Sequence, residues 1–140
     1  MTEAVPPVSE LRTQPPRASQ RARHVLVVED ESPIRAMLAE LLQHAGYAVI
    51  EAGDGREALH RLREQRPDLI ILDLMLPRLD GWTFLRQRQD DPALTTIPVL
   101  VISAAPQQRL LEAKELGADA FLSKPFDLGV LNALVRSFAR

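Results

Sequence analysis

The feature that most constrains this chain is the stretch 69–81, in which a run of branched apolar residues ends in a carboxylate. Its sequence is LIILDLMLPRLDG. A continuous apolar run of this length is typical of a strand buried on both faces, as in a parallel sheet. The Pro and the Asp-Gly pair then end the regular structure. We therefore expect Asp73 at the carboxyl end of a central strand, where open α/β sheets bind their ligands.

The rest of the chain alternates short apolar strands with amphipathic helices. Strands are predicted at 24–28, 47–51, 69–72, 97–103 and 120–123, and helices at 33–45, 56–65, 81–89, 107–116 and 128–138. Short crossovers of this kind are right-handed and produce a parallel sheet with helices on both faces. The simplest fold is α/β, a flavodoxin-like doubly wound sheet of five strands in the order 2-1-3-4-5 with five helices.

Helix ends and buried helix faces follow from local patterns. Ser32 before Pro33 predicts a helix start with Ser32 as the N-cap, and Asp127 is the expected cap of the last helix. Gly46 and Gly117 follow helices and are expected to end them. The apolar side chains expected on buried helix faces are Ile34, Met37, Leu38, Leu41, Leu42, Ala58, Leu59, Leu62, Trp82, Phe84, Leu85, Leu110, Leu111, Leu116, Leu128, Leu131, Leu134, Val135 and Phe138.

Composition sets the class of protein. The 140 residues suffice for one domain with a single core, and the net charge of −2 indicates no polyanionic partner. The chain has no cysteine, which excludes disulfides and thiolate metal sites. Residues 1–23 are polar and interrupted by prolines, so we expect a disordered tail before a domain at 24–140. Without a secretory or membrane-spanning pattern, a cytoplasmic protein is expected.

Polar side chains follow four of the five predicted strands. They are Glu29 and Asp30 after the first strand, Asp73 after the third, Ser103 at the end of the fourth and Lys124 after the fifth. In the order 2-1-3-4-5 these strands are neighbours, so the five side chains face one crevice. Three carboxylates in a small volume repel unless a cation lies among them. Mg²⁺, a hard ion with oxygen ligands, is the expected occupant.

This set of side chains suits phosphoryl transfer, with a nucleophilic carboxylate, a metal, a hydroxyl from Ser103 and a positive charge from Lys124. Each residue also has a purely structural interpretation. The acids after the first strand could simply favour a helix N-terminus, and Asp73 could cap a loop. Ser103 could be a turn residue, and Lys124 with Pro125 could mark a strand exit. Their coincidence at one sheet edge favours the functional interpretation.

The sequence resembles the receiver domain of bacterial two-component response regulators over residues 24–140. The matching segments are VVEDE (27–31), AGDGREAL (52–59), DLMLP (73–77) with DG (80–81), ISA (102–104) and GADAFLSKPF (117–126). The resemblance implies a CheY-like fold in which Asp73 accepts a phosphoryl group from a phosphohistidine of a histidine kinase or a histidine phosphotransfer protein.

The resemblance also implies the roles of the other site residues. Mg²⁺ would be held by Asp30, Asp73 and the backbone carbonyl of Met75, with Glu29 contributing through a water molecule. Lys124 would pair with the phosphoryl oxygens, and its bond to Pro125 would be the family's cis peptide.

Four residues matter for switching and for the lifetime of the phosphorylated form. Ser103 and Phe121 resemble the family's switch pair, which would rebuild the surface formed by residues 107–138 after phosphorylation. Phe121 could equally be an ordinary core residue. Met75 and Ala105 flank the mouth of the pocket in the family, and neither side chain can hold an attacking water strongly. The expectation is slow self-dephosphorylation.

The expected output is a changed protein-binding surface. Nothing follows Arg140, and no helix-turn-helix or basic recognition helix is visible, so we expect a stand-alone receiver that controls a partner protein without binding DNA or membrane. A phosphoryl shuttle in a multistep phosphorelay is an alternative. We expect a phosphoacceptor rather than an enzyme with a separate substrate. An aspartyl-nucleophile phosphatase would need an acid where Met75 lies, and a flavin or nucleotide module would need a phosphate-binding loop after the first strand.

Overall fold

The structure, a computed structural model, describes residues 22–139. In chain order the elements are β1 (His24–Val28), α2 (Ser32–His44), β2 (Ala48–Ala52), α3 (Gly55–Glu64), β3 (Leu69–Leu72), α4 (Gly81–Gln89), β4 (Val99–Ser103), α5 (Gln107–Glu115), β5 (Ala120–Ser123) and α6 (Leu128–Phe138). The predicted tail comprises residues 1–23, and residues 1–21 of it lie outside the part of the chain that the structure describes.

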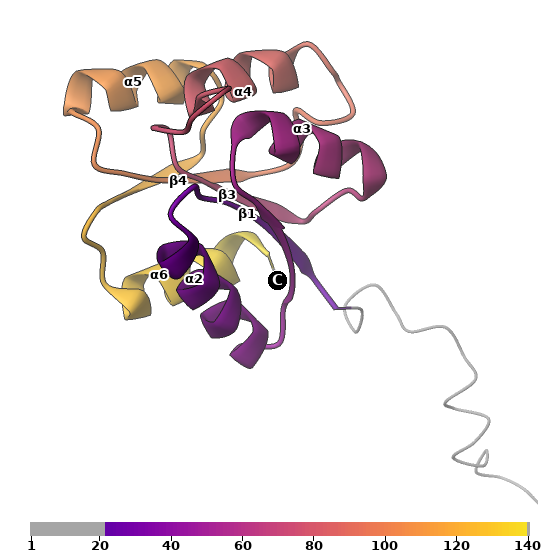
Figure 1. Cartoon of the computed structure of the whole chain (residues 1–140), viewed down its shortest axis with the longest axis vertical. Helices are drawn as coiled ribbons and strands as arrows, with labels where there is room; N and C mark the ends of the chain where they lie inside the picture. Colours follow the sequence, from indigo (N-terminus) through magenta and orange to yellow (C-terminus); the bar gives the residue numbers. More distant parts are fainter. Residues whose placement is uncertain (1–21, 140) are drawn as a thin grey trace, which may run out of the picture.

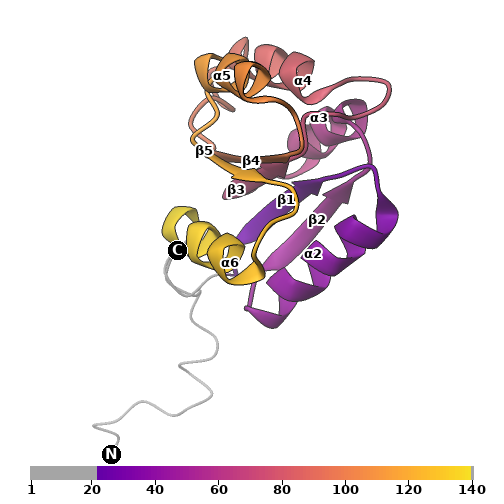
Figure 2. The same cartoon turned by 90° about the vertical axis from the view of Figure 1, so that its left-hand side faces the viewer.

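The five strands form one parallel sheet in the order β2-β1-β3-β4-β5, which confirms the predicted fold class. Helices α2 and α6 lie on one face of the sheet, and α3, α4 and α5 lie on the other (Figures 1 and 2). The register pairs Val28 with Leu72 and Leu72 with Val101. Because the central strands end at nearly the same level, the residues that follow them meet at one edge of the sheet.

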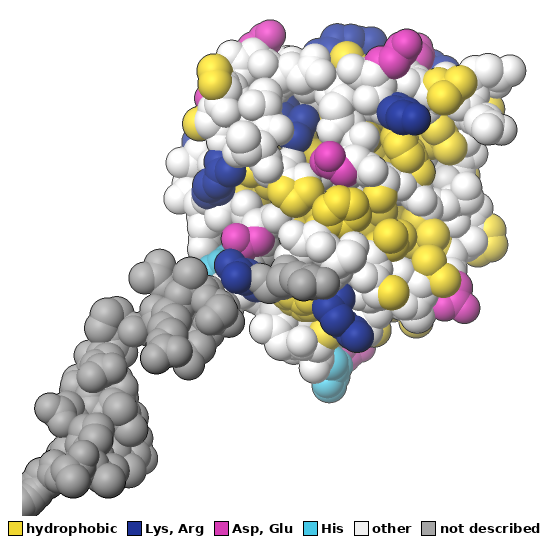
Figure 3. Space-filling model, turned by 180° about the vertical axis from the view of Figure 1, so that it is seen from behind, with side chains coloured by type: hydrophobic (Ala, Val, Ile, Leu, Met, Phe, Trp, Pro, Cys, Tyr) yellow, Lys and Arg dark blue, Asp and Glu magenta, His cyan; other side chains and the backbone are white. Residues whose placement is uncertain are grey.

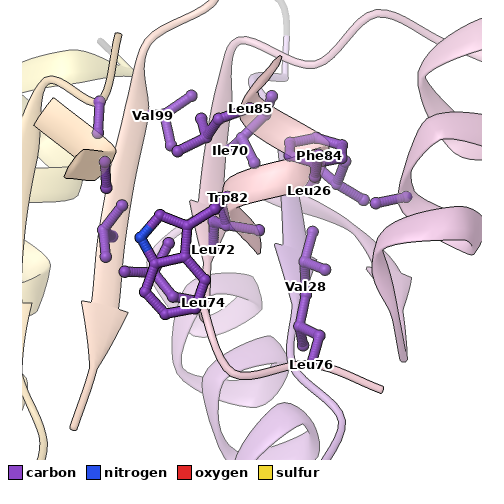
Figure 4. Close-up of a cluster of buried hydrophobic side chains, with 14 of the residues drawn as sticks. Leu26, Val28, Ile70, Leu72, Leu74, Leu76, Trp82, Phe84, Leu85 and Val99 are labelled. Carbon is purple, nitrogen blue, oxygen red and sulfur yellow. The ribbon is translucent and has the colours of Figure 1, made fainter. Parts of the chain in front are cut away.

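Two apolar cores lie on the two sides of the sheet. Strand β3 serves both, since all four of its side chains are fully buried. Ile70 and Leu72 point to the side of α4, where they meet Phe84, Leu85 and Trp82 (Figure 4). Leu69 and Ile71 belong to the core under α2 and α6. Each fully buried side chain of this size contributes about 1.5–3 kcal/mol, so the central strand is fixed strongly.

Gly81 allows α4 to begin close to the end of β3. A Cβ atom on Gly81 would lie 2.6 Å from Leu74 Cα and 2.8 Å from Asp73 O. Gly81 N also donates a hydrogen bond of 2.8 Å to Leu74 O. Any larger residue would therefore displace the loop that carries Asp73.

The predicted helix caps agree with the structure except at α2, and α3 begins and ends one residue earlier than predicted. Asp127 caps α6 by accepting from Val130 N at 3.0 Å, and Gly46 and Gly117 have φ of 98° and 101° after α2 and α5. In α2 the N-cap is Glu31, so the predicted cap at Ser32 is wrong by one residue. The reason is that Glu31 O already accepts the first helical bond, from Arg35 N at 2.9 Å.

Three predicted core side chains are exposed instead. Met37 is 40%, Leu111 is 56% and Leu128 is 41% exposed. Each lies at the flank of an apolar helix face that is wider than the sheet beneath it can cover. Met37 and Leu128 line one surface groove, and Leu111 lines another beside Phe121. The part of the chain that the structure describes contains no helix long and apolar enough to cross a bilayer.

Candidate functional site

The backbone continues the strand pairing past the ends of three strands, and this holds the predicted site residues in place. Glu29 N donates to Ala52 O and Asp73 N donates to Val28 O, both at 3.0 Å, and Lys124 N donates to Ser103 O at 3.1 Å. Glu29, Asp73 and Lys124 therefore leave the sheet in fixed directions. The prediction that these strand ends bring their side chains to one edge is confirmed.

Lys124 is the centre of the hydrogen bonding at this edge. Its Nζ lies 2.7 Å from Glu29 Oε1 and 2.9 Å from Asp73 Oδ2. The Glu29 side chain is fully buried, and those of Asp73 and Lys124 are 6% and 16% exposed. One ammonium thus serves two buried carboxylates, and these contacts are charge-assisted.

Burial and hydrogen bonding have opposing effects on the pKa values of Glu29 and Lys124. Burial raises the pKa of Glu29 above its ordinary value, although the hydrogen bond from Lys124 works against that rise. Burial also works to lower the pKa of Lys124, but its hydrogen bonds to Glu29 and Asp73 outweigh this effect and the pKa lies above its ordinary value. Lys124 is therefore charged at neutral pH.

Three carboxylates form a possible metal site. Glu29, Asp30 and Asp73 each offer an oxygen, and these oxygens lie within 4.8 Å of one another. Asp30 is exposed while Glu29 and Asp73 are buried, so the cluster is open to solvent on one side. An all-oxygen, negatively charged set of this kind fits a hard divalent cation that keeps some of its water ligands.

Asp73 has partners for both of its carboxylate oxygens. Oδ2 accepts from Lys124, and Oδ1 accepts from Met75 N at 3.2 Å. Glu29 is similarly engaged, because its Oε2 accepts from Glu31 N at 3.2 Å while Oε1 pairs with Lys124. The predicted water-mediated role of Glu29 and the predicted ligation by the Met75 carbonyl stay predictions. The Met75 side chain is 58% exposed at the mouth of the site.

Ser103 and Phe121 lie on the neighbouring strands β4 and β5. Ser103 is buried, and its Oγ accepts a hydrogen bond from Ala105 N at 3.1 Å.

 

Phe121 is half-buried and lines a groove of about 200 Å³ whose other lining residues are Gln107, Leu110, Leu111 and Lys114. Ala105, which was expected to flank the mouth of the pocket, is buried. The predicted Lys124–Pro125 cis peptide is confirmed.

Sequence reasoning missed two arginines and an aspartate that hold the loops of the site. Arg35 Nη1 donates to Glu29 O at 2.7 Å, and Arg78 Nε donates to Asp54 Oδ2 at 2.6 Å. Asp54 also caps α3, accepting from Glu57 N at 2.7 Å. The hydrogen bond from Glu57 N, assisted by Arg78, lowers the pKa of Asp54. The spacing of Asp54 and Glu57 was a usable signal, since an Asp followed three residues later by Glu is typical of a helix start.

Comparison with known proteins agrees with this geometry. The family model for the response regulator receiver domain matches residues 25–136. The alkaline phosphatase synthesis transcriptional regulatory protein PhoP of Bacillus subtilis is 39% identical over 120 residues, which cover 84% of this chain and 49% of that protein. The chain thus spans about half the length of this curated relative.

Solved structures give the same result. The chemotaxis response regulator CheY4 of Vibrio cholerae has a TM-score of 0.79 at 33% identity, covering 84% of this chain and 99% of that one. The receiver domain of the sensor histidine kinase PA1611 from Pseudomonas aeruginosa has a TM-score of 0.77 at 27% identity, covering 84% and 98%. That structure has a magnesium ion coordinated in its active-site cleft. This chain belongs to the response regulator receiver domain family.

Proposed function

We propose that this protein is a phosphorylation-dependent signalling switch whose phosphoacceptor is Asp73. The observation that carries the proposal is the position of Lys124, whose Nζ lies 2.9 Å from Asp73 Oδ2 at an edge that also holds Glu29 and Asp30. A nucleophilic carboxylate beside a fixed positive charge and an acidic cluster is the arrangement that phosphoryl transfer needs.

The donor in this proposal is a phosphohistidine of a histidine kinase or of a histidine phosphotransfer protein. A carboxylate oxygen of Asp73 forms a bond to phosphorus, while the bond between phosphorus and the histidine nitrogen breaks. The electron pair of that bond returns to the imidazole, which takes up a proton. The product is an acyl phosphate on Asp73, so the protein is modified once per event and turns over no separate substrate.

Charge compensation comes from both sides of Asp73. Lys124 exchanges a carboxylate partner for a phosphoryl oxygen, which its compact and flexible ammonium can follow. Asp30, Asp73 and the Met75 carbonyl would hold Mg²⁺, with Glu29 acting through water. When bound, Mg²⁺ would supply positive charge that offsets the negative charge of the phosphoryl oxygens.

The switch in this proposal uses Ser103 and Phe121. The Ser103 hydroxyl moves from Ala105 N toward a phosphoryl oxygen, and the Phe121 ring turns into the space that this movement opens. Phe121 borders the groove on α5, so its rotation changes the surface of α5, β5 and α6. Two states separated by a local change of charge are sufficient for such a response.

The output is a protein partner that binds the α5–β5–α6 surface in only one of the two states. Hydrophobic side chains form a band across this side of the molecule (Figure 3), and Leu111 and Val130 are 56% and 48% exposed. Transfer of the phosphoryl group to a histidine phosphotransfer protein is the alternative output. Direct binding of nucleic acid or membrane is not part of the proposal, and the cytoplasmic location stays a prediction.

Intact mass measurement after incubation with a small phosphodonor and Mg²⁺ tests the proposal. We expect one phosphoryl adduct on the wild type and none on Asp73→Asn. Asp90→Asn is the control, because Asp90 is an exposed aspartate at the end of α4 outside the acidic cluster, and it should be labelled like the wild type. An unlabelled wild type, or an equally labelled Asp73→Asn variant, would contradict the function.

A further inference from the structure

Arg35 joins three segments at the edge of the candidate site. It lies in the first turns of α2 with its side chain 23% exposed. Its Nη1 donates to the backbone carbonyl of Glu29 at 2.7 Å, and its Nε donates to Glu51 Oε1 at 3.3 Å on β2. The guanidinium therefore connects α2, the acidic turn after β1 and the second strand.

The carbonyl that Arg35 binds belongs to the peptide between Glu29 and Asp30. On the near side of this peptide, Glu29 N is fixed to Ala52 O at 3.0 Å. On the far side, Glu31 N is fixed to Glu29 Oε2 at 3.2 Å, and Arg35 N binds Glu31 O at 2.9 Å. The bond from the guanidinium is therefore what fixes the orientation of the peptide that leads into Asp30.

Asp30 depends on this backbone more than its neighbours in the acidic cluster do. Glu29 and Asp73 are buried and are held by the ammonium of Lys124. Asp30 is exposed, so packing does little to hold its carboxylate near the other two. The position of the Asp30 carboxylate therefore depends on the orientation of the backbone at residues 29 and 30.

The choice of arginine fits a task with two acceptors. A guanidinium has a planar set of donors that can bind a carbonyl and a carboxylate at the same time in a fixed geometry. A lysine at this position would place its donors on one nitrogen, whereas Arg35 reaches its two acceptors from two different nitrogens, Nη1 and Nε.

We propose that Arg35 is a positioning residue that holds the Glu29–Asp30 peptide so that Asp30 is preorganised to bind a divalent cation with Asp73. This inference rests on the proposed function and adds a determinant of its metal affinity. Groups that orient metal ligands without touching the metal typically change the affinity by roughly 10–100-fold when they are removed. Because the bond here is to the main chain, we expect roughly a tenfold loss.

The test compares Mg²⁺ binding by the full chain without any phosphodonor, followed by the amide NMR signals of residues 29–31 and 73–75. Arg35→Met should raise the dissociation constant roughly tenfold while keeping the aliphatic stem of the side chain. Arg35→Lys should recover part of the affinity. Glu51→Gln, which leaves the bond to Glu29 O intact, should stay within about twofold of the wild type, as should Arg61→Met on α3.

A second readout separates positioning from a general loss of structure. At saturating Mg²⁺, Arg35→Met should accept the phosphoryl group at nearly the wild-type rate, and its thermal midpoint in EDTA should match that of Glu51→Gln. An unchanged Mg²⁺ affinity in Arg35→Met would overturn the inference, as would an equal loss in Glu51→Gln. A wild type that binds Mg²⁺ but is never labelled on Asp73 would instead contradict the proposed function.

Discussion

Lys124 and Glu29 form an ion pair of 2.7 Å between residues that lie 95 positions apart in the chain. The Glu29 side chain is fully buried and that of Lys124 is 16% exposed. Because Lys124 also binds Asp73, these contacts connect the residues that follow β1, β3 and β5. It therefore connects the chemistry of the site to the stability of the fold.

Lys124→Met should lower the free energy of unfolding by roughly 3 kcal/mol, because it leaves the buried carboxylate of Glu29 without its counter-charge. Urea denaturation at pH 7 in EDTA measures this change. The double variant Glu29→Gln with Lys124→Met removes the buried charge as well, and it should be more stable than Lys124→Met alone. A double variant that is equally unstable would contradict the role assigned to the ion pair.

Asp54 should make stability depend on acid pH. Its folded-state pKa is lowered, first by the hydrogen bond from Glu57 N and then by Arg78, whereas the unfolded chain has an ordinary pKa of about 3.9. The carboxylate therefore stabilises the fold above about pH 4, and this stabilisation is lost as the pH falls through the folded-state pKa.

Asp54→Asn keeps a good helix cap but loses the ion pair with Arg78. At pH 7 we expect it to be less stable than the wild type by about 0.5–1 kcal/mol. Between about pH 5 and pH 3, the range around the ordinary pKa, the stability of the variant should fall less steeply than that of the wild type. Parallel slopes for the two proteins in urea denaturation would rule this out.

Arg88 on α4 is buried, and its Nη2 donates to Thr95 O at 3.0 Å and to Ile97 O at 2.6 Å. These bonds hold the segment between α4 and β4. Arg88→Met fills a similar volume but leaves the two carbonyls without this donor, which should cost roughly 1–3 kcal/mol. Arg86→Met is the matched control on the exposed side of the same helix and should change stability by less than about 0.5 kcal/mol.

The sheet and the strand ends could be predicted from sequence because each depends on a local pattern. The apolar run of β3 and the turn residues after it are sufficient to place Asp73. The alternation of elements predicts a parallel doubly wound sheet, of which the observed strand order is the simplest form. The exposure of Met37 and Leu111 could not be predicted in this way. A helical period shows where an apolar face lies, but not how much of it the sheet covers.

The contacts of the site were less predictable for a different reason. Arg35 donates to a backbone carbonyl, and every residue has one, so no residue type marks the partner. Arg78 pairs with Asp54 across 24 positions, in a loop where Arg78 has φ of 65°. Both contacts depend on the three-dimensional path of loops, which propensity and periodicity do not encode.

Met75 should limit how quickly the phosphorylated form decays. Its side chain is 58% exposed at the mouth of the site and offers no strong hydrogen bond to an attacking water. Met75→Asn introduces a donor and an acceptor there. One added hydrogen bond of about 1.4 kcal/mol in the transition state corresponds to a rate increase of roughly tenfold. The rate is measured as loss of the phosphoryl group, followed by intact mass after the phosphodonor is removed.

Met75→Leu is the matched control. Its phosphorylated form should decay like that of the wild type, because leucine adds no polar group. Equal acceleration in both variants would show that access of water to the site, rather than hydrogen bonding, sets the rate.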